Sequence, residues 1–519
     1  MGISIPFVIS LIVLTIASAF ANGRFSSFLA YQVQIFTLSF STQFFKSQSA
    51  YSLSVLASLY TGAFIGFNGV VSMPFYMFPV VVLVVSGLLY IAPHFAALSL
   101  SSRVSYPISF PVFFSVCSFF FRTLSPWSCQ GLPALASSQS FYVPILSYVG
   151  IEGLSYVSVA LPCVLGHICK MLKEFQQNMP KFTMSKMLLF GLSLLIFSAN
   201  VFTSYDFTNY PRTIEVSGIV MPRHDVPAIT SSNRAEFERR ALDWAFDLST
   251  DVAHQSKLIV WSETMVNVSI TSTFNTFDEL FIRARDFTKS HSVYLVTTYH
   301  LNYENGTVFN ELAVFSNGEL LGKYTKVNLV FLAEDHITPA DSKEKPLLID
   351  TEFGRLGLLI CHDLDFPFFT SHLQSADLVI VPAWDWKGIP RNTFGSTLRA
   401  AELGIPIVRV THAGWSAVTD HVSNHLFGAS HFSRPIECPE WVSQLGSTCE
   451  SGGVLQFSMP VPIGRRFVLF AYIRHLIPPF MILLLVAVLI KCLQKPVKQD
   501  EEELTTLFVS RQGSSSLFR

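Results

Sequence analysis

The residue with the clearest capacity for chemistry is Cys361, which follows an apolar run that begins at Leu356 and ends at Ile360. A thiol that a buried strand delivers onto a turn rich in acidic residues is suited to nucleophilic attack. Near pH 7 a neutral thiol is a poor nucleophile, because its reference pKa is about 8.5. Such a thiol needs a base to take its proton and a positive group to stabilise the oxyanion formed on attack.

Two segments upstream supply these groups. Glu263 ends the short apolar run that starts at Leu258, and it is the candidate base if it is partly desolvated. Lys326 is the candidate stabiliser of the oxyanion, together with the backbone N–H that follows Cys361, and Glu334 is expected to orient the ammonium. Each residue type alone is more common in a surface or core role. Their order along the chain therefore carries the prediction.

Metal-dependent chemistry has no support in the sequence. The fourteen histidines are dispersed, and His336, His362 and His412 lack the spacing of metal ligands. We therefore expect neither a metal ion nor a cofactor.

Strands and helices alternate in the part of the chain that carries these residues. Strands are expected at 213–221, 257–263, 293–300, 347–350, the run into Cys361, 377–382 and 405–411, with helices at 233–255, 273–291 and 393–403. Alternation of this kind indicates an α/β fold, whereas the turn at Asn317 and Gly318 predicts an antiparallel hairpin. A layered α-β-β-α sandwich over residues 210–462 satisfies both observations.

The rest of the chain is apolar. Of the 519 residues, 50% are hydrophobic and only 14% are charged. Stretches of roughly 17–25 apolar residues predict membrane-spanning helices. Eight candidates are 3–20, 27–45, 51–71, 75–97, 106–121, 142–166, 187–204 and 472–490. We therefore expect a polytopic helical bundle of seven spans at 1–204, the α/β domain inserted at 210–462, an eighth span at 472–490 and a tail at 491–519. Glu152, an acidic residue well inside a predicted span, is expected to face the bundle interior.

Basic residues indicate the orientation of these spans. The loop at 169–186 and the start of the tail contain Lys170, Lys173, Lys181, Lys186, Lys491, Lys495 and Lys498. The positive-inside rule then predicts that the N-terminus, this loop and the tail are cytoplasmic. The α/β domain is expected outside, in a bacterial periplasm or a eukaryotic secretory lumen. Alternatively, residues 1–21 are a cleaved signal peptide, because small residues at Ala17, Ala19 and Ala21 resemble a cleavage site.

Other features of the outer domain leave alternatives open. Cys438 and Cys449 lie close in sequence and either form a local disulfide or remain two free thiols. Tripeptides starting at Asn267 and Asn305 match the glycosylation pattern and favour a eukaryotic lumen. The net charge of −1 does not bear on a nucleic-acid partner, and no basic stripe in the sequence suggests one.

The motifs resemble those of the apolipoprotein N-acyltransferases, the membrane-embedded branch of the carbon–nitrogen hydrolase (nitrilase) superfamily. Ile259–Glu263 is similar to the base motif of that family, and Gly322–Val330 with Glu334 to its lysine segment. Ile360–Pro367 is similar to its nucleophile motif, and Leu398–Leu403 to a helix behind its active site. The likeness covers most of residues 120–470, and it implies the α-β-β-α fold and the seven-plus-one topology.

The resemblance also implies roles for individual residues. The catalytic residues are then Glu263, Lys326 and Cys361, supported by Glu334, Asp363 and Arg399. The implied reaction moves an acyl chain from a membrane phospholipid to Cys361 as a thioester, and then to the α-amine of a lipid-modified N-terminal cysteine of a lipoprotein. The chain departs from the family in three places. Cys361-His362-Asp363 replaces Cys-Tyr-Glu, and Val330–Ala333 replaces a Pro-Phe-Gly segment. The segment Pro382–Trp386 keeps the Ala-Trp pair of the family but lacks the Asn-Asp that precedes it.

Two other functions remain open. In a membrane-tethered amidase of the same fold, water would resolve the acyl-enzyme, and the spans would serve only as anchors. In a non-enzymatic receptor or scaffold, the lumenal domain would bind a partner, and the altered Asp363 and Val330–Ala333 segments would reflect lost catalysis. Seven spans are more than an anchor requires, which favours the acyltransferase, and an amine other than a lipoprotein would serve as acceptor in a eukaryote.

Overall fold

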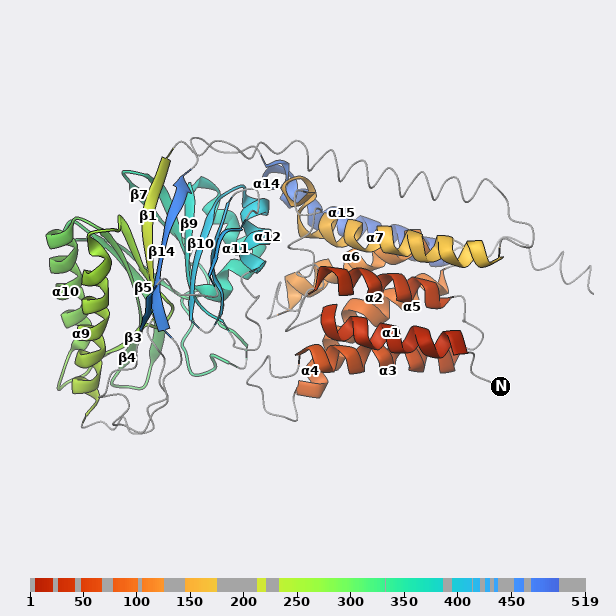
Figure 1. Ribbon diagram of the computed structural model, residues 1–519, viewed down its shortest axis with the longest axis horizontal. Helices are drawn as coiled ribbons and strands as arrows, with labels where there is room; N and C mark the ends of the chain where they lie inside the picture. Colours follow the sequence, from red (N-terminus) through yellow and green to blue (C-terminus); the bar gives the residue numbers. More distant parts are fainter. Residues whose placement is uncertain are drawn as a thin grey trace, which may run out of the picture.

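The computed structural model describes residues 5–21, 27–42, 48–67, 78–100, 105–125, 145–174, 212–220, 233–331, 333–385, 394–412, 414–420, 425–429, 434–436, 452–461 and 468–493. Its elements form two parts that lie end to end (Figure 1): a bundle of helices, and a domain of two β-sheets with helices on their outer faces. The predicted separation of an apolar helical part from an α/β part is therefore visible in the structure.

The helical part is built from N-terminal and C-terminal elements. These are α1 (Ile5–Ala21), α2 (Phe28–Ser41), α3 (Gln48–Phe67), α4 (Phe78–Ser86), a π-helical turn η2 (Gly87–Ile91), α5 (Ala92–Ser99), α6 (Tyr106–Leu124), α7 (Leu146–Glu174), α14 (Leu469–Ile473), a 3₁₀ turn η9 (Arg474–Leu476) and α15 (Ile477–Leu493). Apolar side chains from α1, α2, α3, α6 and α7 form one buried cluster, in which Tyr31, Phe110 and Phe114 are fully buried.

Three described helical stretches are long and apolar enough to cross a membrane: Val82–Ser99, Tyr106–Leu124 and Leu146–Cys169. They correspond to the predicted spans 75–97, 106–121 and 142–166. Shorter apolar helices occupy Ile5–Ala21, Leu53–Ile65 and Arg474–Ala487. The predicted span 187–204 lies outside the described residues, as do Cys438 and Cys449. The seven-plus-one topology, its orientation and the domain boundaries therefore stay predictions.

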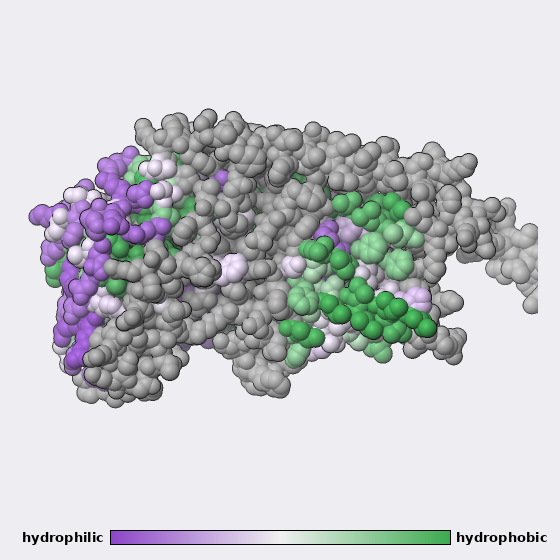
Figure 2. Space-filling model, in the orientation of Figure 1, coloured by the Kyte–Doolittle hydropathy of each residue, from purple (hydrophilic) through white to green (hydrophobic). Residues whose placement is uncertain are grey.

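The two parts of the molecule have different surfaces (Figure 2). Hydrophobic residues gather over the helical bundle, and hydrophilic residues over the opposite end of the molecule. On α1, the side chains of Ile5, Ile9, Ile12 and Ile16 are all more than half exposed. Large exposed apolar patches are uncommon on soluble proteins, so this surface fits contact with lipid rather than with water.

One sheet of the α/β domain combines parallel and antiparallel strands. It contains β1 (Arg212–Val220), β2 (Leu258–Trp261), β3 (Val266–Ile270), β4 (Tyr294–Tyr303), β5 (Val308–Ser316), β6 (Glu319–Thr325), β13 (Arg434–Ile436) and β14 (Gly452–Val461). The order is β13-β14-β1-β2-β4-β5-β6, and β3 also pairs with β4. β2 lies parallel to β1 and β4, whereas the hairpin strands β5 and β6 are antiparallel.

The second sheet lies between the first sheet and the helical bundle (Figure 1). It contains β7 (Leu347–Thr351), β8 (Gly354–Leu358), β9 (Leu378–Trp384), β10 (Ile407–His412), β11 (Ser416–Thr419) and β12 (His425–Ala429), in the order β12-β11-β10-β9-β8-β7. The three central strands β8, β9 and β10 are parallel. Because they run in the same direction, residues that follow them gather at one edge of the sheet.

Alternating side chains explain the layers. Leu258 and Val260 of β2 belong to the core between the two sheets, where they join Ile380 of β9. Their neighbours Ile259 and Trp261 point to the other face and pack against α9 (Arg234–Ala253) and α10 (Thr276–His291). Side chains of successive strand residues point to opposite faces, so one four-residue strand serves two cores. The outer face of the second sheet carries η6 (Cys361–Asp365), α11 (Pro367–Thr370), η7 (Ser371–Ser375) and α12 (Phe394–Leu403).

The predicted α-β-β-α sandwich is confirmed by this arrangement. The tight turn between β5 and β6 is also confirmed, since Asn317 and Gly318 both have positive φ, at 51° and 82°, as a type I′ hairpin turn requires. Strand β3 and the strands β11 to β14 were not predicted from the sequence. β3 is short and begins only three residues after Glu263, which concealed it within the loop expected after β2.

Candidate active site

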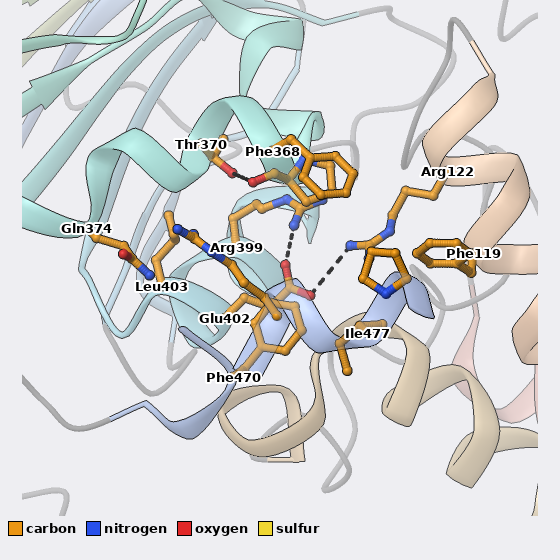
Figure 3. Close-up of a pocket in the computed structure, with 13 residues that line it drawn as sticks. Phe119, Arg122, Phe368, Thr370, Gln374, Arg399, Glu402, Leu403, Phe470 and Ile477 are labelled. Atoms are coloured by element: carbon orange, nitrogen blue, oxygen red, sulfur yellow. Dashed lines mark hydrogen bonds and ion pairs between the residues drawn. The ribbon is translucent and has the colours of Figure 1, made fainter. Parts of the chain in front are cut away.

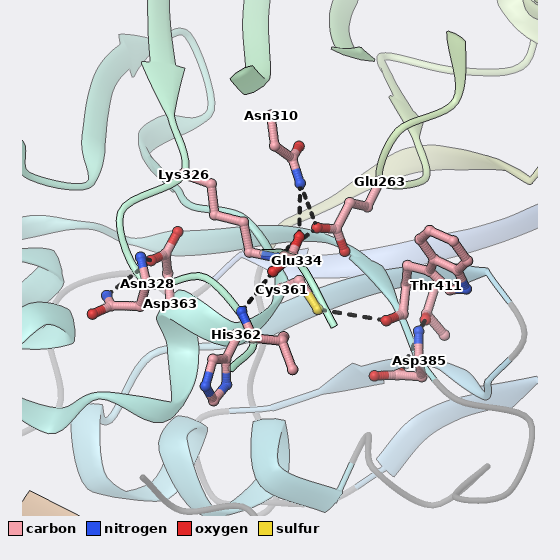
Figure 4. A network of polar contacts seen from close by, with 12 residues as sticks. Glu263, Asn310, Lys326, Asn328, Glu334, Cys361, His362, Asp363, Asp385 and Thr411 are labelled. Carbon is pink, nitrogen blue, oxygen red and sulfur yellow. Dashed lines mark hydrogen bonds and ion pairs between the residues drawn. The ribbon is translucent and has the colours of Figure 1, made fainter. Parts of the chain in front are cut away.

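The three candidate catalytic residues follow the ends of three different strands. Glu263 lies two residues after β2, Lys326 directly after β6, and Cys361 three residues after β8. All three side chains are buried, with 4%, 1% and 4% of their residue surface exposed. Figure 4 shows them pointing toward one another although they come from two sheets. The structure therefore brings together the residues that the sequence pattern singled out.

Cys361 occupies a sharp turn between a strand and a helix. Its φ is +47°, a left-handed conformation that non-glycine residues seldom adopt. It is also the first residue of η6, preceded by extended Ile360. A strained turn of this kind projects a nucleophile out of the strand, and such strain is found preferentially at functional sites. The amide of His362, expected to help stabilise an oxyanion, lies in the first turn of the same 3₁₀ helix; its role stays a prediction.

Lys326 is held by two carboxylates. Its Nζ donates to Oε1 of Glu263 at 2.7 Å and to both oxygens of Glu334 at 2.8 Å. Glu334 also accepts from the backbone N–H of Val330 at 2.7 Å. The ammonium is thus held in one position by two carboxylates, as expected of a group that stabilises an oxyanion. The second oxygen of Glu263, Oε2, is buried and has no hydrogen-bond partner among the described residues.

Asn310 connects the two carboxylates and was not predicted. Its Nδ2 donates to Oε1 of Glu263 at 2.8 Å and to Oε1 of Glu334 at 3.4 Å. Its backbone oxygen accepts from the N–H of Lys326 at 2.9 Å. This residue lies on β5, in a run where nothing in the local sequence marks it. Only the pairing of β5 with the segment after β6 reveals its position.

In this cluster, burial and the neighbouring charges shift the pKa values of Lys326 and Glu334 in opposite directions. Burial alone would lower the pKa of Lys326, but Glu263 and Glu334 outweigh it and hold the pKa of the ammonium well above its ordinary value. The pKa of Glu334 shifts in the opposite direction. Burial raises it, but the contact with Lys326 lowers it by more, so the net shift is downward. The lysine is therefore positively charged at neutral pH, which is the state that stabilises an oxyanion.

The thiol of Cys361 is protonated at rest. Burial and then the nearby Glu263 raise its pKa well above the ordinary value, while Lys326 and Arg409 pull in the opposite direction. A thiol in this state requires a base at the moment of attack, because the thiolate is the nucleophilic form. Glu263, with one unpartnered oxygen, has the position and chemistry for that task.

A second ion pair borders the sulfur. Sγ of Cys361 lies 3.7 Å from the backbone oxygen of Trp384 and 3.9 Å from Nη2 of Arg409. Arg409 is in turn paired with Asp385 through Nη2 to Oδ1 at 2.6 Å and Nε to Oδ2 at 3.2 Å. Asp385 also accepts from the hydroxyl of Thr411 at 2.9 Å. The pair was not predicted from the sequence, since Arg409 lies on β10 whereas Asp385, 24 positions earlier, directly follows the adjacent parallel strand β9.

Asp363 has partners of its own. It accepts from the hydroxyl of Tyr324 at 2.7 Å, and from the backbone N–H and Nδ2 of Asn328 at 2.7 and 2.9 Å. Burial raises its pKa to about 6 despite these donors. Asp363 therefore ties η6 to the segment on both sides of Lys326. This geometry is compatible with the predicted supporting role, with the shorter side chain reaching the lysine segment.

Arg399 lies away from the sulfur, in a pocket between the α/β domain and the helical bundle (Figure 3). It pairs with Glu402 on the same helix, and its Nη2 donates to the backbone oxygen of Asp365 at 2.9 Å. It does not belong to the cluster around Lys326. Any support that Arg399 gives the site must therefore act through the end of η6.

Among the described residues, no group of three or more His, Cys, Asp or Glu side chains is arranged to hold a metal ion. What the cluster offers instead is a thiol, a carboxylate with an open oxygen, and a fixed ammonium. This set suits attack on a carbonyl carbon through a covalent thioester. The predicted glycosylation tripeptides at Asn267 and Asn305 lie on β3 and on the turn between β4 and β5, and their modification stays a prediction.

Comparison with known proteins agrees with this chemistry. Residues 239–436 match the carbon–nitrogen hydrolase family. An apolipoprotein N-acyltransferase of Rickettsia typhi is 25% identical over 334 residues, which are 58% of this chain and 64% of that protein. A deaminated glutathione amidase of Escherichia coli O157:H7 is 29% identical over 124 residues, 23% of this chain and 47% of that protein. The chain thus matches about half to two thirds of the length of these curated relatives.

Among solved structures, an amidase from Nesterenkonia sp. is similar, with a TM-score of 0.36 and 17% identity over 48% of this chain and 90% of the amidase. The family match falls on the α/β domain, and the 334 residues matched to the N-acyltransferase are more than that domain contains. Residues 239–436 are therefore similar to the carbon–nitrogen hydrolase family, and the chain is similar to the apolipoprotein N-acyltransferases over 58% of its length.

Proposed function

We propose that this protein is an N-acyltransferase that moves a fatty acyl chain from a membrane phospholipid through a thioester on Cys361 to an amine. The preferred acceptor is the N-terminal lipidated cysteine of a lipoprotein. The observation that carries the proposal is the shared ammonium of Lys326, bonded to Glu263 and Glu334 beside a strained cysteine turn. The similarity to N-acyltransferases over 58% of the chain supports the choice of acceptor.

In the first half of the reaction, Sγ of Cys361 attacks the ester carbonyl carbon while Glu263 takes the thiol proton. The negative oxygen that forms is stabilised by the ammonium of Lys326. The bond from carbon to the glycerol oxygen then breaks, and the proton on Glu263 passes to that oxygen. A lysophospholipid leaves, and the acyl chain remains on the sulfur.

In the second half, an uncharged amine attacks the thioester carbonyl. Glu263 takes a proton from the amine, the carbon–sulfur bond breaks, and the proton returns to the sulfur of Cys361. An amide is formed, and the enzyme regains its starting state. The buried cluster must exclude water between the halves, because hydrolysis of the thioester would waste the acyl group.

The apolar helices give the reaction a physical setting. Moving an acyl chain from a bilayer into water costs about 0.8 kcal/mol per CH₂ group. A domain attached to membrane helices receives the ester at the lipid surface and avoids most of that cost. On this proposal the domain lies on the periplasmic or lumenal side, and the termini lie in the cytoplasm.

A second candidate is a membrane-tethered amidase in which water is the acceptor. The similarity to deaminated glutathione amidases favours it. The two functions share every step up to the thioester. They differ only in whether an amine or water resolves it.

The test uses the full-length protein in phospholipid vesicles with isotope-labelled acyl chains. We expect peptide mass spectrometry to find an acyl adduct on Cys361, and addition of a diacylglyceryl-cysteine peptide to convert it into an N-acylated peptide. Cys361→Ala should form no adduct, and Cys361→Ser should fail because a hydroxyl is a weaker nucleophile under the same base. Cys117→Ala, at a thiol in α6, is the matched control and should behave like the wild type.

Free fatty acid without N-acylated peptide would favour the amidase. No adduct on Cys361 with either acceptor present would contradict both enzymes and favour a binding protein. Glu263→Gln tests the base independently of the nucleophile, since it keeps the thiol and removes the proton acceptor. We expect it to lower the rate of adduct formation by about 10²- to 10⁴-fold.

A further inference from the structure

A buried chain of charged side chains joins the helical bundle to the turn that carries Cys361. Its centre is Glu402 on α12, which is 2% exposed. Oε1 of Glu402 accepts from the backbone N–H of Ile151 on α7 at 2.8 Å. A carboxylate from the α/β domain thus binds a backbone amide of a helix in the apolar bundle.

The bond to Ile151 lies at a break in α7. Gly150 has φ 66° and ψ −167°, so the regular helix starts anew at Ile151. The first N–H groups of a helix have no partner within it, and a carboxylate is favoured there by the helix dipole. Glu402 therefore caps this helix segment from another part of the chain.

Arg122 approaches the same carboxylate from α6. Its guanidinium is paired with Glu152 of α7 and lies 3.6 Å from Oε1 of Glu402. The Arg122 side chain is only 4% exposed, and its Nε and Nη1 find no hydrogen-bond acceptor among the described residues. This arginine consequently depends on its two carboxylates for compensation of a buried charge.

Arg399 extends the chain toward the active site. It is one turn before Glu402 on α12 and pairs with its Oε2, while its Nη2 donates to the backbone oxygen of Asp365 at 2.9 Å. Asp365 is the last residue of η6, the 3₁₀ helix that Cys361 begins. Figure 3 shows the carboxylate of Glu402 between Arg399 and Arg122, with a contact to each of them.

Apolar packing fixes α12 in the same place. Leu398 and Ala401 of α12 belong to the buried cluster of the helical bundle, whereas Ala400 faces the core between the sheets. α12 is therefore shared by both cores. A shift of the bundle helices relative to the domain would move α12, and with it the residue that holds the end of η6.

We propose that Arg122, Glu402 and Arg399 are positioning residues through which the membrane bundle sets the orientation of Cys361 relative to Glu263. Buried ion pairs have few alternative arrangements, because any unpaired member bears a large desolvation penalty. The chain of contacts Arg122–Glu402–Arg399–Asp365 therefore acts as a rigid connection between α6 and the cysteine turn. The inference rests on Cys361 being the reactive thiol of the proposed function.

The test measures alkylation of Cys361 by iodoacetamide in the full-length protein in lipid nanodiscs, with peptide mass spectrometry to separate this thiol from the others. It requires no acyl donor or acceptor, so its outcome is independent of which acceptor the enzyme uses. With Glu263 in place, the alkylation rate should vary little between pH 6 and 8. Without that internal base, the rate should rise about tenfold per pH unit, in proportion to the thiolate.

We expect Glu402→Gln and Arg122→Gln each to slow alkylation at pH 7 at least fivefold and to steepen its pH dependence. The double variant should be no slower than the slower single variant, because both changes break one connection. Glu238→Gln is the matched control: Glu238 is a buried carboxylate of α9 that accepts from Ser269 and Thr276, far from this chain of contacts. It should leave the slope unchanged even if it lowers stability.

If Arg122→Gln fails to fold, Arg399→Lys keeps the charge but loses the geometry of the guanidinium, and should give the same steepened slope. A pH dependence equal to that of the wild type in Glu402→Gln and Arg399→Lys would overturn the proposal. The two proposals can also fail separately. If the wild type is alkylated rapidly with little pH dependence but forms no acyl adduct in vesicles, the proposed function is rejected and the positioning role stands.

Discussion

The guanidinium of Arg409 lies 3.9 Å from the sulfur of Cys361 while it is bound to both oxygens of Asp385. The arginine is buried, and its pKa stays above the ordinary value because Asp385 and Cys361 outweigh the effect of burial. A permanent positive charge beside the sulfur favours the thiolate over the thiol. Arg409 thus provides a second cation for the nucleophile, distinct from Lys326.

The first prediction concerns this arginine. Arg409→Gln removes the charge that lowers the pKa of Cys361, so the pKa of the thiol should rise further. Each added unit removes about tenfold of the thiolate at a given pH. In a Glu263→Gln background, where the alkylation rate follows the thiolate, the pH profile of Cys361 alkylation should therefore move to higher pH. Arg283→Gln, at an exposed ion pair with Asp243, should leave it in place, and an unmoved profile in Arg409→Gln would argue against an electrostatic role.

Lys326→Met is expected to be costly to stability as well as to activity. The substitution leaves Glu263 and Glu334 buried without their shared cation, and breaking a buried pair in this way costs about 3–5 kcal/mol. Lys257→Met, at an exposed pair with Glu352, should cost about 1 kcal/mol or less. Denaturation in detergent measures both. Equal stability of the two variants would mean that the carboxylates are not held apart from water as the structure indicates.

Asp363 should give the protein a measurable pH dependence of stability. Its ordinary pKa is 3.8, and burial raises it to about 6 in the folded protein. Between these values the folded state binds more protons than the unfolded state, so this residue lowers stability as the pH rises from about 4 to 6. The total is on the order of 3 kcal/mol. Asp363→Asn should remove that decline, and unfolding of both proteins across pH 4–7 compares them; parallel curves would contradict the assignment.

Gly150 is expected to tolerate no side chain. Its φ is +66°, and a Cβ atom there would lie 2.3 Å from Cε2 of Phe470 on α14. Gly150→Ala should therefore destabilise the contact between α7 and α14 by at least about 1 kcal/mol. Because part of the loss is steric, Gly150→Ala combined with Phe470→Ala should be less destabilised than the sum of the two single variants. Strict additivity, measured by thermal unfolding, would show that the backbone conformation alone accounts for the effect.

The sequence by itself determined the layers of the domain and three residues of the candidate site. Alternating and continuous apolar runs depend on neighbours within a few positions, so the strands before Glu263 and Cys361 could be identified locally. The turn at Asn317 and Gly318 was equally local. The order of a carboxylate, a lysine and a cysteine after strand ends sufficed to indicate a thiol-based site, and the family resemblance then gave its reaction.

Only the tertiary structure decided what surrounds those residues. Asn310 and Arg409 lie within strands, where the local sequence pattern does not distinguish a site residue from a structural one. Their partners come from other segments of the chain. Glu402 looks like an ordinary helix residue until α12 is seen to cap a broken helix of the bundle at Ile151. These contacts depend on how separate elements pack. Packing follows from the shape and burial of the whole chain, which no short segment contains.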